Sequence, residues 1–233
     1  MKNTLSTIAF LFIALGNLYA HNMWIETSGT GKLGKEQSVK VYLGGYGENE
    51  RDSTKNWFGN TKEFTLWITE PNGTKKQLTT KAAAICFEAT FTPDKEGVYT
   101  VSLSHELAEL FGTTKYVYYS VSQVRVGAST AGQNNLTTND LTIKLANAVA
   151  KKPVAVTVQY KGKNAENTWA SVGAPTGWAK ALDAKTGTAT FDALWEGLYV
   201  VEASYKEKSE GILAGKEYKT ISHTATFGVT INK

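Results

Sequence analysis

The chain alternates apolar and polar residues over short stretches, which is the period of strands that bury one face. The stretches with this pattern are residues 39–43, 64–69, 87–91, 98–103, 154–160, 188–191, 198–205 and 220–231. Turn-forming residues separate them, as in Pro71-Asn72-Gly73, and only 106–111 has the pattern of a short helix. Short, regularly spaced strands predict an all-β chain of immunoglobulin-like or prealbumin-like Greek-key β-sandwiches.

An internal repeat predicts how many sandwiches there are. Ala89-Thr90-Phe91 precedes a Glu-Gly-x-Tyr sequence that contains Tyr99, and Ala189-Thr190-Phe191 precedes the same sequence around Tyr199. In both copies we expect a strand, a glycine turn and a strand whose tyrosine ring packs against the core. The pattern predicts one sandwich over 21–127 and a second over 140–233, joined by a polar linker at 128–139.

The N-terminus has the features of a secretory signal. Lys2 is followed by an apolar run from residue 8 to 18, and Leu18-Tyr19-Ala20 is an acceptable cleavage site. We therefore expect residues 1–20 to be a signal peptide and the mature chain to begin at His21, with an uncleaved anchor as the alternative. No later stretch is apolar over the length that a transmembrane helix needs, so we expect no transmembrane segment in the mature chain.

Charge and cysteine content narrow the classes of function. The net charge is +4, and the basic residues are dispersed without a stripe or polybasic patch, which argues against nucleic acid as a partner. The single cysteine, Cys86, lies in the apolar sequence Ala84-Ile85-Cys86-Phe87 and is expected to be a buried thiol. A role as a soft-metal ligand is the alternative.

Three histidines are the candidate metal ligands: His21, His105 and His223. A mature N-terminal histidine offers its α-amine and its imidazole to one metal ion. His105 and His223 are each in phase with the apolar positions of a predicted strand, so burial competes with metal binding at both. A cluster of three imidazoles would suit nickel, copper or another divalent transition metal. Met23 is either a thioether ligand or a core residue.

Two further features have alternative interpretations. The segment 44–52 is rich in glycine and acids, so it is either an oxygen-donating edge of a metal site or an ordinary solvated loop. Four tryptophans either form a surface that stacks on sugars or pack in the core or at the domain interface; they are Trp57, Trp169, Trp178 and Trp195. The sequence contains no serine-nucleophile elbow, zinc-protease helix or phosphate-binding glycine loop.

These residues resemble a known family, the periplasmic accessory proteins of nickel and cobalt uptake, a domain of unknown function related to the NikM-like proteins. The similarity lies in Ala20-His21-Asn22-Met23-Trp24-Ile25-Glu26, in the glycine loop at 44–48, and in 116–127. Residues 187–203 are similar to the carboxypeptidase-regulatory type of sandwich that follows in this family. The family often has histidine where this chain has Tyr46, which is a weaker metal donor.

The resemblance implies a binding protein that is not an enzyme. We therefore expect an exported, periplasmic protein that binds nickel, cobalt or copper through His21 for uptake or delivery, with a membrane metal transporter as a partner. One alternative is a copper oxygenase that uses an N-terminal histidine brace on polysaccharide. The other is a non-catalytic structural or carbohydrate-binding surface module.

Overall fold

The computed structural model describes residues 21–134, 137–146, 148–174 and 176–232, so the predicted signal peptide lies outside the described residues. The regular secondary structure of the described chain is almost entirely β-strand, which confirms the predicted all-β sandwich fold. Its helical elements are two single 3-10 turns, Thr54–Asn56 and Thr61–Glu63.

The first half of the chain contributes a sheet of four strands, in the order β1-β3-β7-β6. The strands are β1 (Asn22–Thr27), β3 (Gln37–Gly44), β7 (Phe87–Phe91) and β6 (Lys81–Ala82). Alternate residues of β1 and β3, among them Met23, Ile25 and Val41, are buried in a first core. The expected alternation of apolar and polar positions therefore places one face of this sheet inward.

A second sheet of nine strands belongs to both halves of the chain, in the order β14-β13-β16-β17-β9-β8-β4-β5, with β2 paired to β9. The strands from the first half are β2 (Thr30–Gly31), β4 (Leu66–Thr69), β5 (Lys75–Leu78), β8 (Gly97–Glu106) and β9 (Thr114–Val126). Those from the second half are β13 (Trp169–Gly173), β14 (Ala179–Leu182), β16 (Gly197–Leu213) and β17 (Lys216–Ile231).

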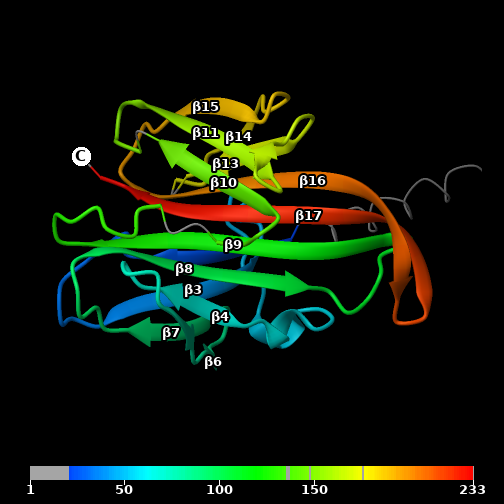
Figure 1. Cartoon of the computed structure of the whole chain (residues 1–233), viewed down its shortest axis with the longest axis horizontal. Coiled ribbons are helices and arrows are strands. Elements are labelled where there is room, and N and C mark those ends of the chain that lie inside the picture. Colours follow the sequence, from blue (N-terminus) through cyan, green and yellow to red (C-terminus); the bar gives the residue numbers. More distant parts are fainter. Residues whose placement is uncertain (1–20, 135–136, 147, 175, 233) are drawn as a thin grey trace, which may run out of the picture.

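A third sheet completes the second half of the chain. It consists of β10 (Leu141–Ala146), β11 (Pro153–Tyr160), β12 (Lys163–Asn164) and β15 (Thr188–Asp192). In Figure 1, β16, β17, β9 and β8 run side by side through the middle of the molecule, with β10, β11 and β15 above them and β3, β7 and β6 below. The outer sheets thus cover opposite faces of one shared sheet.

The two sandwiches are joined by more than the segment between them. No described residue of 127–140 lies in a strand, so this segment separates the strands of the two halves. However, β17 pairs in parallel with β9 from Thr220↔Thr114 to Gly228↔Ser122. Backbone hydrogen bonds therefore link the last strand of the chain directly to the first sandwich, and the two halves form one continuous structure.

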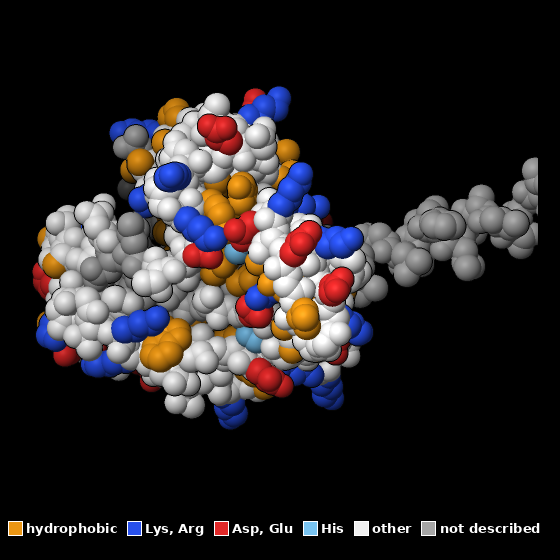
Figure 2. All heavy atoms as spheres, turned by 45° about the vertical axis from the view of Figure 1, so that its right-hand side comes forward, with side chains coloured by type: hydrophobic (Ala, Val, Ile, Leu, Met, Phe, Trp, Pro, Cys, Tyr) orange, Lys and Arg blue, Asp and Glu red, His pale blue; other side chains and the backbone are white. Residues whose placement is uncertain are grey.

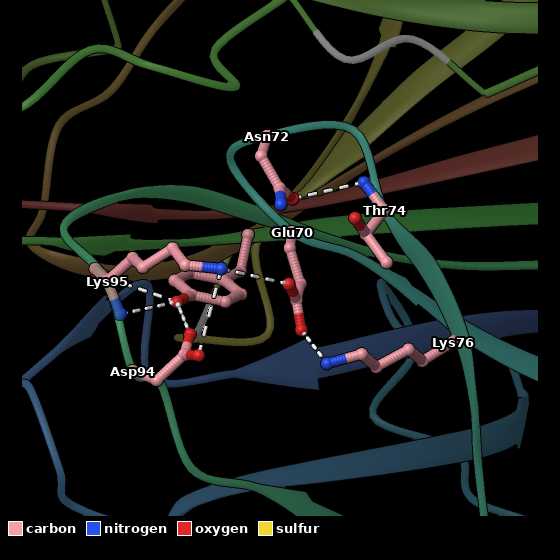
Figure 3. Close-up of polar contacts among 7 residues, drawn as sticks. Glu70, Asn72, Thr74, Lys76, Asp94 and Lys95 are labelled. Carbon is pink, nitrogen blue, oxygen red and sulfur yellow. Dashed lines mark hydrogen bonds and ion pairs between the residues drawn. The ribbon is translucent and has the colours of Figure 1, made fainter.

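The internal repeat corresponds to the same corner in each sandwich. The Tyr99 hydroxyl donates to the Lys95 carbonyl at 3.0 Å and accepts from the Lys95 amide at 3.1 Å. The Tyr199 hydroxyl makes the same pair of bonds with Trp195, at 3.1 and 3.0 Å. Figure 3 shows the first corner, where Lys95 also lies 3.8 Å from the buried carboxylate of Glu70. Both are tyrosine corners of Greek-key sandwiches.

Removing either corner hydroxyl should destabilise the fold. Tyr99→Phe and Tyr199→Phe each leave a backbone amide and carbonyl without their partner, so we expect each to lower the free energy of unfolding by about 1–2 kcal/mol. Urea denaturation measures this, with Tyr218→Phe in the exposed β16–β17 hairpin as the control. Unfolding free energies that stay at the wild-type value would show that the corners do not stabilise the protein.

The prediction of a short helix at 106–111 is wrong. Glu106 ends β8, and the next residues turn back toward β9. The Leu107 amide bonds to the Tyr116 carbonyl at 3.0 Å, and the Phe111 amide bonds to the Thr114 carbonyl at 3.0 Å. The backbone amides that a helix would bond internally therefore bond to carbonyls of β9. Leu107 is buried in the first core.

Candidate functional site

His21 lies at the beginning of β1, between two carboxylates. Its Nδ1 is 2.8 Å from Asp52 Oδ2, and its Nε2 is 3.4 Å from Glu50 Oε2. The His21 side chain is 24% exposed, so the ring lies at the surface and is accessible to a solute. With Nδ1 beside Asp52, Nε2 is the ring nitrogen that remains for a metal ion, and the Glu50 carboxylate lies next to it.

The two carboxylates reach His21 because of the pairing between β1 and β3. Asn22 pairs with Gly44 at the end of β3, so the loop that follows β3 lies beside the first residues of β1. The Glu50 amide bonds to the Gly45 carbonyl at 2.9 Å and the Asp52 amide to the Leu43 carbonyl at 2.9 Å. These bonds close the loop back on itself and position both acids.

Glycine is required at the start of this loop. Gly44 has a φ of +148°, and a Cβ atom there would lie 2.5 Å from the carbonyl oxygen of Glu50. The glycine-rich segment at 44–52 is therefore an ordered acidic loop at the side of His21. This is the location that an oxygen-donating edge would need.

Two further acids lie next to this site. Burial, and then repulsion from Glu48, raise the pKa of Glu202 to about 8, while a hydrogen bond to the Asn22 side chain acts in the opposite direction. Glu202 comes from β16, in the second half of the chain. No local pattern in the sequence predicted this residue, because only the shared sheet brings β16 near the start of β1.

Tyr46 holds the loop rather than offering a metal ligand. Its hydroxyl donates to the Leu198 carbonyl at 2.7 Å, and its ring meets that of Trp24 edge to face at 5.8 Å. Burial raises the pKa of Tyr46 to about 12, so the phenol is protonated. The Arg51 guanidinium lies 5.6 Å from the centre of the Tyr46 ring and 5.2 Å from that of Tyr42. This packing anchors the loop to both halves of the protein.

His105 and His223 lie on opposite faces of the shared sheet. His105 pairs with Tyr118 of β9, whereas His223 pairs with the adjacent Val117. Because successive residues of a strand face opposite sides, the two imidazoles diverge. His105 belongs to the side of the first core and His223 to that of the second.

Both of these histidines are buried. His105 Nε2 has no hydrogen-bond partner among the described residues, and desolvation lowers the pKa of this ring. His223 Nδ1 is 3.0 Å from the Tyr119 hydroxyl, and its Nε2 is 3.3 Å from Glu207 Oε2. Desolvation lowers the pKa of His223 despite the opposing effect of Glu207.

The expected cluster of three imidazoles does not form. Across the described part of the chain, no group of three or more His, Cys, Asp or Glu side chains is arranged to hold a metal ion. The reason is geometric, since His105 and His223 face different cores. Of the three histidines, His21 alone has a partly exposed ring, and it lies between two carboxylates.

Three of the remaining candidate side chains, Met23, Cys86 and Trp57, are buried. Met23 is buried in the first core, and Cys86 is buried beside Tyr42, where desolvation raises the pKa of its thiol. Trp57 is also buried in the first core and Trp169 is 52% exposed, while the Trp178 and Trp195 rings meet at 6.0 Å. Because Trp57 lies inside the protein, the four tryptophans do not form one sugar-stacking surface.

No helix in the described residues has the length and apolar character needed to cross a membrane. No family model and no curated protein sequence matches the chain. Among solved structures, the chain is similar to a mutant of the Salmonella alpha-2-macroglobulin, with 10% sequence identity and a TM-score of 0.32. The match covers 91% of this chain and 15% of that protein, so the chain spans a small part of its length. At this level, the similarity carries no inference about function.

Proposed function

We propose that the protein is an exported, periplasmic metal-binding accessory protein that holds one divalent nickel, cobalt or copper ion at His21. The observation that supports this most directly is the position of the His21 ring between Asp52 and Glu50, at the residue that the predicted cleavage makes the N-terminus. Imidazole and carboxylate are ligands that such metals accept. The proposed role is uptake or delivery together with a membrane transporter.

Two ways of binding metal are available to His21. In the first, the α-amine and Nδ1 form a chelate ring, which requires Nδ1 to leave Asp52, 2.8 Å away. In the second, Nδ1 keeps its proton and donates it to the Asp52 carboxylate, which orients the ring, while Nε2 and Glu50 bind the ion. The second arrangement has the form of the carboxylate–histidine–metal contacts common in proteins. It also needs no rearrangement of the acidic loop.

Calorimetric titration of the mature protein with Ni(II), Co(II) and Cu(II) tests this function. We expect one equivalent to bind and His21→Ala to abolish binding. Under the second arrangement, Asp52→Asn and Glu50→Gln should each weaken affinity about 10–100-fold, and an extra glycine before His21 should have little effect. Under the chelate, the extra glycine should abolish binding and Asp52→Asn should not weaken it.

Glu36→Gln, an exposed acid outside the loop, is the matched control and should bind like the wild type. Equal binding by the wild type and His21→Ala would disprove the proposed function. The copper-oxygenase alternative is less well supported, because its brace needs a second imidazole. His105 and His223 lie on opposite faces of the shared sheet, and the side chains that contact the His21 ring are Asp52 and Glu50.

A further inference from the structure

A polar groove lies on the face of the shared sheet opposite to His21. It has a volume of about 760 Å³ and is lined by the ends of β8, β9, β16 and β17, by the β4–β5 hairpin and by residues 137–140. Figure 2 shows a hollow on this side of the molecule, where acidic and basic side chains gather around histidine. The groove forms because the third sheet covers only part of this face.

The floor of the groove is held by hydrogen bonds. His223 contacts Tyr119 through Nδ1, at 3.0 Å, and contacts Glu207 and the Tyr160 hydroxyl through Nε2, at 3.3 and 3.4 Å. The Tyr160 ring stacks on Tyr205 at 4.4 Å. Since both ring nitrogens of His223 are engaged within the protein, the floor is preorganised and needs no ligand to order it.

Four of the six charged residues that line the groove form two ion pairs. Lys115 Nζ lies 2.8 Å from Glu106 Oε2, and Lys161 Nζ lies 3.1 Å from Glu207 Oε1. The other ionic residues of the lining are one cation, Lys75, and one anion, Asp140. This balance gives the groove no net preference for an anion or a cation, so its chemistry favours a neutral ligand.

The rest of the lining combines hydroxyl groups with an aromatic ring. Ser102 and Ser104 of β8 and Thr69 of β4 line the groove beside Trp67, and Lys75 Nζ lies 4.6 Å from the centre of the Trp67 ring, over one of its two faces. Sugars present hydroxyls to such groups and C–H faces to aromatic rings. We infer that the groove binds a neutral saccharide, at a site separate from His21.

Titration with cellopentaose, chitopentaose and maltopentaose, followed by calorimetry and by NMR saturation transfer, tests this inference. We expect at least one of them to bind, with an affinity that changes little between low and high salt because the ligand is uncharged. Trp67→Ala should weaken binding about tenfold, which corresponds to about 1.4 kcal/mol. Ser104→Trp, on an exposed position of β8, should fill the groove and abolish binding.

Trp169→Ala, at an exposed tryptophan outside the groove, is the matched control and should bind like the wild type. Circular dichroism of Ser104→Trp checks that this variant is folded. The inference would be overturned if none of the three sugars bound, or if a folded Ser104→Trp bound them as the wild type does. Binding of tetraalanine, a zwitterionic peptide, in place of all three sugars would also overturn it. None of these outcomes depends on metal binding at His21, which lies on the other side of the sheet.

Discussion

Gly228→Ala should lower the free energy of unfolding by about 3 kcal/mol, since the added methyl group has no room. A Cβ atom at this position of β17 would lie 2.5 Å from the backbone carbonyl oxygen of Ile25. The strand β1 crosses β17 here, and the Thr226 hydroxyl donates to the Met23 carbonyl at 2.8 Å. The clash is with backbone, so β1 itself must move away from the shared sheet.

Urea denaturation followed by tryptophan fluorescence measures this effect. Gly211→Ala is the matched control on β16, because the added methyl group would meet only the end of the flexible Tyr218 side chain. We also expect Gly228→Ala to weaken metal binding, since a displaced β1 carries His21 with it. A Gly228→Ala protein as stable as the control would show that β1 does not approach β17 as closely as the structure has it.

Glu202→Gln should stabilise the protein at high pH and have little effect at low pH. The pKa of Glu202 is raised from 4.5 to about 8 in the folded protein, mainly by burial and then by Glu48. Because this pKa is higher in the folded protein than in the unfolded chain, the Glu202 carboxyl contributes stability that is fully present below pH 4.5. That contribution is lost as the pH rises to about 8. Above that range the wild type holds an unfavourable carboxylate that glutamine lacks.

We expect the variant to be more stable than the wild type by about 3 kcal/mol at pH 9. The free-energy difference calculated from the whole pKa shift would be larger. We expect a smaller value because the Glu202 side chain is partly exposed to water, which weakens the effect. Unfolding free energies at several pH values from about 4 to 9 measure the difference, with Glu36→Gln as the control. A constant difference between wild type and variant over this range would contradict the raised pKa.

Local signals in the sequence predicted a substantial part of the structure. Alternating polarity identified most of the long strands, and the repeat around Tyr99 and Tyr199 located two equivalent corners, because a strand's period and a glycine turn depend on residues close together in the chain. The acidic segment at 44–52 was predicted to be either an oxygen-donating edge of a metal site or a solvated loop, and the structure places it beside His21. The antiparallel pairing of β1 with β3 brings this segment and His21 together.

The tertiary structure alone decided which histidines could act together. Alternation showed that His105 and His223 each face an apolar side of a strand, which is correct for both. Alternation does not show which of the two cores each histidine faces, because that depends on how strands from distant parts of the chain pair. The register of β8 and β17 on either side of β9 assigns the two rings to different cores.

The same pairing created the features that the sequence did not reveal. Glu202 approaches the His21 site, and the groove forms over His223, only because β17 joins the second half of the chain to β9 of the first. The sequence by itself thus determined the strands, the corners and the acidic loop, which arise from short-range periodicity and turn chemistry. Long-range strand pairing, which has no local signature, determined where their side chains meet.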